Sequence, residues 1–134
     1  MTGEAKGTFE VKTAPLGPDE AINVTSIGRY SLDKTYRGDL EAVSAGEMLG
    51  AGNLATGTAG YVAIEQVTGT LGGVSGSFAL QHFGTMEAGN FDLTVQVVPG
   101  SGTDGLAGIA GSLTILIDAG KHSYRLEYVL PDGP

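Results

Sequence analysis

The stretch that decides the fold is GYVAIEQVTGTLGGVSGSFALQHFGT, residues 60–85. On each side of Gly72-Gly73, apolar and polar residues alternate with a period of two, which is typical of a strand with one buried face. Two glycines between such runs are typical of a two-residue hairpin turn. The stretch therefore predicts two antiparallel strands, Gly60–Thr70 and Ser75–Thr85.

The length of this turn also sets the pairing of the two strands. A two-residue turn pairs Glu65 with Leu80 and Ala63 with His82. The predicted inner face then holds Tyr61, Ala63, Glu65, Val67, Phe78, Leu80 and His82. We expect Glu65 to lie diagonally across from His82 on one inner wall. A slip of one residue would change the pairing, and one of the two side chains could turn outward.

Outside this hairpin, the chain contains six more alternating segments separated by short turns. They are Gly7–Thr13, Ile22–Tyr36, Leu40–Leu49, Asn90–Val98, Gly111–Ile117 and Lys121–Leu130. Eight strands joined in sequence predict one domain, residues 1–134, folded as a closed eight-stranded antiparallel β-barrel. No long stretch has helical periodicity, and Gly102–Ala110 is expected to hold at most one short helical turn. Such a barrel has room for packed side chains or for one small ligand.

The alternation also assigns most side chains to a face. The apolar sets expected to point inward are Ile22, Val24, Tyr30, Leu32 and Tyr36; Phe91, Leu93, Val95 and Val97; and Tyr124, Leu126, Tyr128 and Leu130. The third strand is ambiguous, because either the side with Glu41, Val43 and Glu47 or the side with Leu40, Ala42 and Ser44 could face in. Apolar residues that fall on the outer face are Val62, Ile64, Phe83 and Val129. Clustered exposed apolar residues mark interfaces, so we expect a homo-oligomer.

Composition excludes several classes of function. The chain has no cysteine, so thiolate catalysis and cysteine-bound zinc are ruled out, and its two histidines are too few for a histidine-rich metal site. We expect no metal and no cofactor. The net charge of −8 disfavours nucleic acid and anionic membranes as partners. Residues 1–6 lack the basic and apolar regions of a signal peptide, so we expect a cytoplasmic protein.

Two glycine-rich segments are turns rather than nucleotide sites. Residues 100–105 spell G-x-G-x-x-G, and residues 50–55 nearly do. A dinucleotide fingerprint must open a helix inside a βαβ unit. Residues 106–111 are too rich in glycine for such a helix and lead into a strand.

The chemistry of the site is predicted from the polar residues of the inner face. A carboxylate inside a barrel needs a partner or a function, because burying it alone is costly. Glu65, His82 and, if the third strand turns that way, Glu47 are the candidate catalytic residues for proton transfer. Tyr61, Tyr124, Tyr128, Phe78 and Leu80 are the candidate ligand-binding residues. The alternative is a Glu65–His82 pair with a purely structural role. If the carboxylate is kept for use, Glu65→Leu should be neutral or stabilising.

Several segments resemble a bacterial family of unknown function, domain of unknown function 3224. They are residues 38–41, 46–49, 60–65, 76–82 and 121–124, and the Leu-Gln-His-Phe-Gly block at residues 80–84 is the most specific. Residues 102–111 also resemble a turn and strand of allene oxide cyclases and dirigent proteins. The resemblance implies an allene oxide cyclase-like β-barrel, often oligomeric, whose relatives steer reactive hydrophobic intermediates without a cofactor.

Three functions fit these expectations. The barrel could bind a small hydrophobic or aromatic molecule and isomerise or cyclise it without a cofactor. It could carry such a molecule without reaction. It could also be an assembly module with a filled core. A solid core of Phe78, Leu80, Phe91, Leu93 and Leu126 would favour the third function, and open space beside Glu65 and His82 the first.

Overall fold

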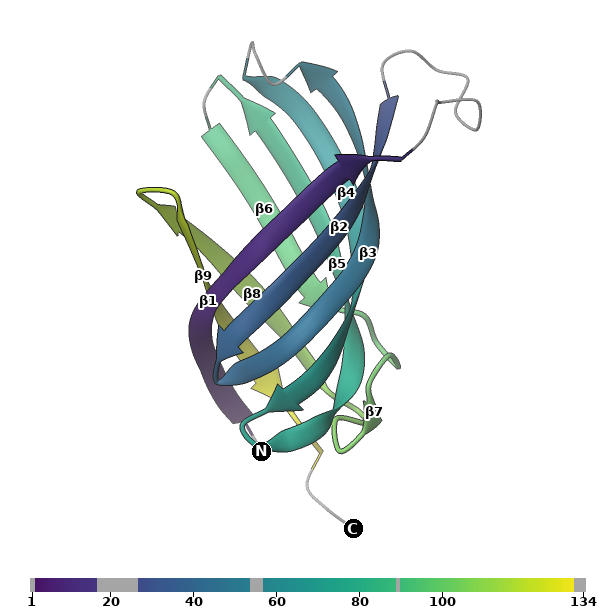
Figure 1. The fold of residues 1–134 in the computed structure, drawn as a ribbon, viewed down its shortest axis with the longest axis vertical. Helices are drawn as coiled ribbons and strands as arrows, with labels where there is room; N and C mark the ends of the chain where they lie inside the picture. Colours follow the sequence, from purple (N-terminus) through teal and green to yellow (C-terminus); the bar gives the residue numbers. More distant parts are fainter. Residues whose placement is uncertain (1, 17–26, 54–56, 89, 132–134) are drawn as a thin grey trace.

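The computed structural model describes residues 2–16, 27–53, 57–88 and 90–131, which form one antiparallel sheet closed into a barrel (Figure 1). Its strands are β1 Thr2–Pro15, β2 Ile27–Gly38, β3 Leu40–Asn53, β4 Thr58–Leu71, β5 Val74–Glu87, β6 Asn90–Val97, β7 Thr103–Asp104, β8 Ala110–Asp118 and β9 Lys121–Val129. Eight of them follow one another around the barrel, from β1 through β6 to β8, β9 and back to β1. The short β7 pairs with the edge of β5 instead. The predicted eight-stranded antiparallel barrel is confirmed.

The β4–β5 turn has the predicted length. Gly72 and Gly73 adopt φ values of +57° and +82°, which two-residue hairpin turns of this hand require and glycine adopts without strain. Glu65 therefore pairs with Leu80 and Ala63 with His82, as expected.

The strands cover the predicted ones to within one residue, except at the start of the second. Residues 22–26 of the predicted second strand, including Ile22 and Val24, lie outside the described residues. In the Gly102–Ala110 segment the structure has β7 and then two overlapping turns, closed by hydrogen bonds from Leu106 N to Thr103 O and from Ala107 N to Asp104 O. The segment folds without a helix, and no helix in the described part of the chain is long and apolar enough to cross a membrane.

Inward-facing side chains are buried at one end of the barrel and exposed at the other. On β6, Val97 and Val95 are buried, whereas Phe91 is 49% exposed. On β8, Leu113 is buried, whereas Ile117 is 60% exposed. The buried end contains a continuous core that includes Phe9, Tyr36, Leu40, Val67, Leu71, Phe78, Leu80, Leu126 and Leu130. The other end of the barrel is open to solvent on its inner side.

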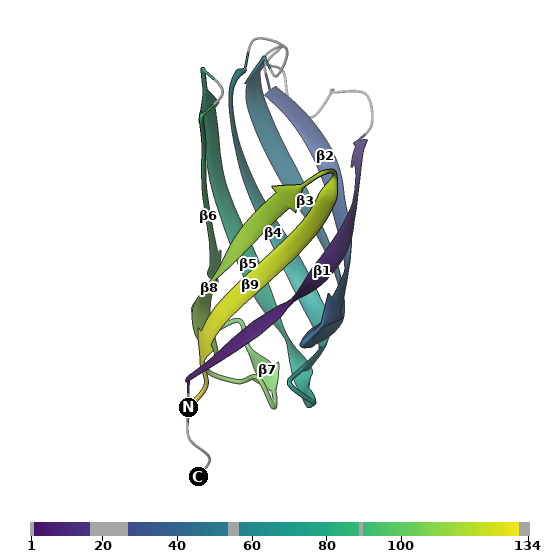
Figure 2. The same cartoon turned by 90° about the vertical axis from the view of Figure 1, so that its left-hand side faces the viewer.

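The open end follows from the position of the β8–β9 hairpin, which pairs with only part of β1 and of β6. Strand β6 pairs with β8 only between Gln96 and Ser112, and β9 pairs with β1 no further than Thr8. The upper parts of β1 and β6 therefore rise beyond the hairpin (Figure 2). The inward-facing Val11 and Phe91 on these two strands are exposed as a result.

Candidate functional site

The centre of the polar interior is the carboxylate of Glu65 on β4, which is completely buried. Lys34 Nζ donates to its Oε2 at 2.8 Å, and Tyr36 OH donates to its Oε1 at 2.5 Å. His82 Nε2 also donates to Oε2, at 2.6 Å. Three donors from β2 and β5 thus satisfy one buried carboxylate, which compensates the cost of removing it from water.

Lys34 is the partner that the sequence interpretation missed. Its side chain is only 3% exposed, and its ammonium group lies 4.9 Å from the centre of the Phe9 ring and 5.7 Å from that of Tyr36. Aromatic faces attract cations at such distances. The alternation in the sequence could have found it. Lys34 lies two residues after Leu32 and two before Tyr36, so it shares their inward face.

These contacts hold Glu65 in its ionised form. Burial alone would raise its pKa. The hydrogen bond from His82, the charge and hydrogen bond of Lys34 and the hydrogen bond of Tyr36 together outweigh burial and lower the pKa of Glu65 to about 2. Burial and then the negative charge of Glu65 raise the pKa of Tyr36 far above its ordinary value. Glu65 is therefore a fixed anion at neutral pH, and Tyr36 a fixed hydroxyl donor.

A second set of contacts leads from Glu65 toward the open end. The other ring nitrogen of His82, Nδ1, lies 3.2 Å from the hydroxyl oxygen of Tyr61. Tyr61 is partly exposed, and its ring packs across the inner face of Gly84, where a Cβ would come within 2.5 Å of it. Burial and then the charge of Glu65 raise the pKa of Tyr61 to about 12. The chain of contacts Glu65–His82–Tyr61 thus joins a buried anion to a phenol that solvent can reach.

The open end of the barrel around Tyr61 is apolar. Inward-facing residues there include Tyr30, Met48, Met86, Phe91 and Leu93. Among the described residues, no inward-facing position of this half carries Asp, Glu, Lys or Arg. Tyr61 is therefore a polar group in a mainly apolar lining.

The prediction that Glu47 joins this interior site is wrong. Glu47 lies on the outer face of β3, where its carboxylate accepts a hydrogen bond from Arg29 Nε at 2.7 Å, and this bond lowers the pKa of Glu47. The inner face of β3 instead carries Leu40, Ala42, Ser44, Gly46 and Met48. Gly46 explains why this face of β3 points inward. A Cβ at this position would meet the backbone oxygen of Ile64 at 2.0 Å, so the position requires glycine. The small residues of β3 face inward beside the large groups on β2 and β4.

The remaining predicted ligand-binding residues occupy the filled end of the barrel. Phe78 and Leu80 are completely buried in the core. The hydroxyl of Tyr124 accepts a hydrogen bond from Leu40 N at 2.9 Å and lies 3.1 Å from the carbonyl oxygen of Arg37, to which it donates. Tyr128 packs against the same core. These four residues face inward as predicted, but they close one end of the barrel and lie away from its open end.

The part of the chain that the structure describes offers no group of three or more His, Cys, Asp or Glu side chains arranged to hold a metal ion. Inside the barrel, the carboxylate of Glu65 binds Lys34, Tyr36 and His82.

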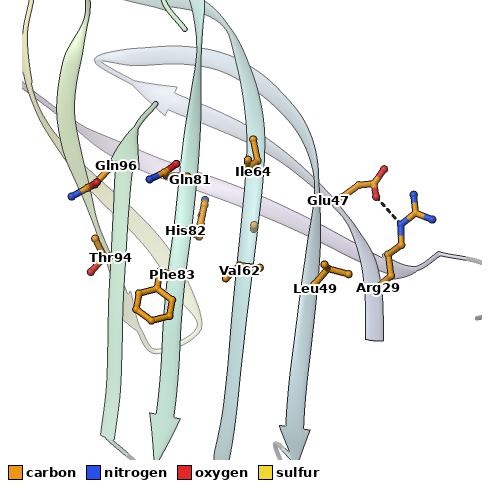
Figure 3. A pocket seen from close by; sticks show the side chains of 11 residues that line it. Arg29, Glu47, Leu49, Val62, Ile64, Gln81, His82, Phe83, Thr94 and Gln96 are labelled. Carbon is orange, nitrogen blue, oxygen red and sulfur yellow. Dashed lines mark hydrogen bonds and ion pairs between the residues drawn. The ribbon is translucent and has the colours of Figure 1, made fainter. Parts of the chain in front are cut away.

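A second feature is an open depression of about 860 Å³ on the outside of the wall, across strands β2 to β6 (Figure 3). Cross-strand pairing aligns its lining in two rows. One row is Arg29, Leu49, Val62, Phe83 and Thr94, and the other contains Glu47, Ile64, Gln81 and Gln96. Its four large apolar side chains, Leu49, Val62, Ile64 and Phe83, are between 42% and 63% exposed. The predicted outward orientation of Val62, Ile64 and Phe83 is confirmed.

Comparisons with known proteins support the fold. Residues 5–128 match the family described as "Protein of unknown function (DUF3224)". The chain is 44% identical to a protein with unknown function from the DUF3224 family of Shewanella oneidensis MR-1, whose crystal structure was determined at 1.84 Å resolution. The two structures superpose with a TM-score of 0.89, over 99% of this chain and 100% of that chain. No curated protein matches the chain. Both descriptions state an unknown function, so the chemistry has to come from the site.

Proposed function

The chain belongs to the DUF3224 family of proteins of unknown function, and we propose that it binds one small, mainly apolar molecule inside the open end of the barrel. The observation that carries the proposal is the Glu65–His82–Tyr61 chain of contacts, which ends on a partly exposed phenol within an apolar lining. Binding sites for small molecules are typically apolar pockets with a few polar groups that fix orientation. Tyr61 is the orienting group here.

The charges around His82 define what Tyr61 offers to a ligand. Lys34 already neutralises Glu65, so a neutral His82 ring adds no net charge to the buried interior. In that form Nε2–H donates to Glu65, and Nδ1 accepts the hydroxyl proton of Tyr61. The Tyr61 oxygen then has a free lone pair for a ligand hydroxyl or another hydrogen-bond donor. The preferred ligand is a cyclic or aromatic molecule with one such polar group.

The same contacts support proton transfer without a cofactor, as in an isomerase. A ligand C–H or O–H bond breaks as its proton forms an O–H bond on Tyr61, and the original proton of Tyr61 passes to Nδ1 of His82. The ligand keeps the electron pair as an enolate or alkoxide, and Glu65 stabilises the imidazolium ring. Return of the proton to a different ligand atom completes an isomerisation. A more specific form of this proposal is an isomerisation that closes a ring, as in the allene oxide cyclases that residues 102–111 resemble.

A carrier without catalysis is the second candidate. The state of Glu65 favours a carrier. Three donors engage the lone pairs of this carboxylate, and its pKa of about 2 prevents it from taking up a proton at neutral pH. Proton transfer therefore depends on Tyr61 and His82 rather than on Glu65, the carboxylate that the sequence placed among the catalytic residues.

Titration with 2-naphthol, a fluorescent aromatic alcohol, tests the binding site. Gly50 faces inward beside Tyr61, with nothing nearer than 3.7 Å to an added Cβ, and Gly60 faces outward on the next strand with a similar 3.6 Å. Gly50→Leu should fill the open end and weaken 2-naphthol binding at least roughly tenfold, whereas Gly60→Leu should leave it unchanged. Tyr61→Phe should weaken binding by up to about tenfold, because one hydrogen bond is lost.

Equal affinities for the Gly50→Leu and Gly60→Leu proteins would refute an inner site. To separate catalyst from carrier, the exchange of the C–H protons of 2-tetralone, the ketone related to 2-naphthol, is followed by NMR in deuterated water. An isomerase accelerates exchange, and His82→Gln and Tyr61→Phe remove the acceleration. A protein that binds 2-naphthol but leaves the exchange rate unchanged is a carrier.

A further inference from the structure

The outer depression across β2 to β6 is the second unexplained feature of the molecule. Its apolar side chains form one continuous strip, because Leu49 pairs with Val62, and Val62 with Phe83 (Figure 3). Phe83 is the most exposed of these side chains, at 63%. Large contiguous apolar patches are uncommon on the surface of monomers, and they often mark an interaction site.

The charge of the protein limits what can cover this strip. The chain carries a net charge of −8, so two copies repel each other over most of their surface. The charged residues that line the depression are Arg29 and Glu47, and their side chains pair with each other at 2.7 Å. The depression is therefore a locally neutral area on an acidic protein, and a second acidic copy can approach there.

The order of residues along the strip also matches a two-fold arrangement. Its charged edge, Arg29 and Glu47, lies on β2 and β3, and its uncharged polar edge, Thr94 and Gln96, lies on β6. A two-fold axis along β4 places Arg29 over Thr94 of the other copy and Glu47 over its Gln81, so that no like charges oppose each other. A two-fold interface brings the same patch of both copies together.

The same axis brings apolar groups together at the centre. Leu49 on β3 comes to face Phe83 of the second copy on β5, and Val62 and Ile64 meet their own equivalents across the axis. In this arrangement Phe83, which is 63% exposed, packs into the depression of the other copy. We propose that this face, the outside of β2 to β6, binds a second copy of the chain and forms a two-fold dimer.

This interface is independent of the ligand site, although both use the same wall. His82 points inward and Phe83, the next residue, points outward. Substitutions on the outer face can therefore remove the dimer while leaving the Glu65 contacts in place.

Sedimentation equilibrium of the full chain tests the proposal. The wild type should have twice the 13.6 kDa mass of one chain, and Phe83→Glu should have the mass of one chain. Leu116→Glu is the matched control, since Leu116 is an exposed apolar residue of β8, which contributes nothing to the depression, and it should remain dimeric. A monomeric wild type overturns the proposal. Dissociation of the Phe83→Glu and Leu116→Glu dimers to the same extent also overturns it.

Cysteine cross-linking checks the position of the axis. The chain contains no cysteine, so a single introduced cysteine can form a disulfide only between copies. Ile64 and Leu116 are 58% and 57% exposed, which makes Ile64→Cys and Leu116→Cys a matched pair. Under mild oxidation, Ile64→Cys should form a covalent dimer much faster than Leu116→Cys. Equal rates, or a trimeric mass, would exclude this two-fold interface even if 2-naphthol binding at the inner site is normal.

Discussion

Replacing Glu65 with leucine is expected to destabilise the barrel by about 3–5 kcal/mol, as removal of one partner of a buried ion pair does. The substitution leaves the ammonium group of Lys34 and the hydroxyl of Tyr36 buried without their acceptor. Urea unfolding followed by circular dichroism gives the free energy of unfolding for both proteins.

The double variant Lys34→Met/Glu65→Leu is the control for this prediction. Replacing both charges with apolar side chains of similar size leaves no unpaired ion, and such replacements are often neutral or stabilising. We therefore expect the double variant to regain most of the stability that Glu65→Leu loses, and Lys34→Met alone to lose stability as well. If Glu65→Leu unfolds at the same urea concentration as the wild type, the ion pair contributes nothing to stability in solution.

The structure favours one of the two outcomes that the sequence left open for this substitution. Glu65→Leu is neutral or stabilising if the carboxylate is kept for use, whereas a structural pair loses about 3–5 kcal/mol when one partner is removed. The deciding residue is Lys34, which lies 31 positions away on β2 and meets Glu65 only because the barrel brings β2 and β4 to opposite sides of β3. Alternation in β2 places Lys34 on the inner side, but alternation along single strands does not show which side chains meet across the interior.

Local patterns were sufficient where two strands are joined by a short turn. The two glycines of the β4–β5 turn set the pairing of Glu65 and His82, because a two-residue turn allows few alternatives. On β3, both faces mix polar and apolar residues, so alternation left Glu47 undecided. Its orientation follows from the close approach of β3 and β4 at Gly46, a tertiary contact.

The open end of the barrel also depends on tertiary structure. The sequence predicted the β8 and β9 strands, and both are short, but it did not show how far β1 and β6 extend beyond them. The exposure of Val11 and Phe91 at inward-facing positions arises because β1 and β6 extend past their last pairs with the β8–β9 hairpin. Tyr61 is therefore partly exposed at the open end, whereas Tyr124 is buried in the core. The sequence pattern places both side chains on the inner face and does not distinguish them.

The wall formed by β4 and β5 carries both proposed functions on its two sides. Inward, Glu65 and His82 are buried and hydrogen-bonded, and Tyr61 is the partly exposed member of this chain of contacts. Outward, Val62 and Phe83 supply the apolar centre of the proposed dimer. Because neighbouring residues in a strand point to opposite sides, each function can be removed separately by substitution.

The stability of the wild type should also fall steeply in acid because of Glu65. The pKa of this carboxyl is about 2 in the folded protein, against its ordinary value of 4.5 in the unfolded chain. A lowered folded-state pKa contributes stability above the ordinary pKa, and that contribution is lost as the pH falls from the ordinary value through the folded one. The shift corresponds to roughly 3 kcal/mol, at about 1.4 kcal/mol for each pH unit.

Comparison with Lys34→Met/Glu65→Leu isolates this effect, because the other acidic residues are common to both proteins. Free energies of unfolding are measured in urea at several values between about pH 5 and pH 2. The difference in stability between the wild type and the double variant should shift by about 3 kcal/mol against the wild type over this range. Two pH profiles that run parallel would mean that the ordinary pKa of Glu65 persists in the folded barrel. The three donors would then not hold its charge.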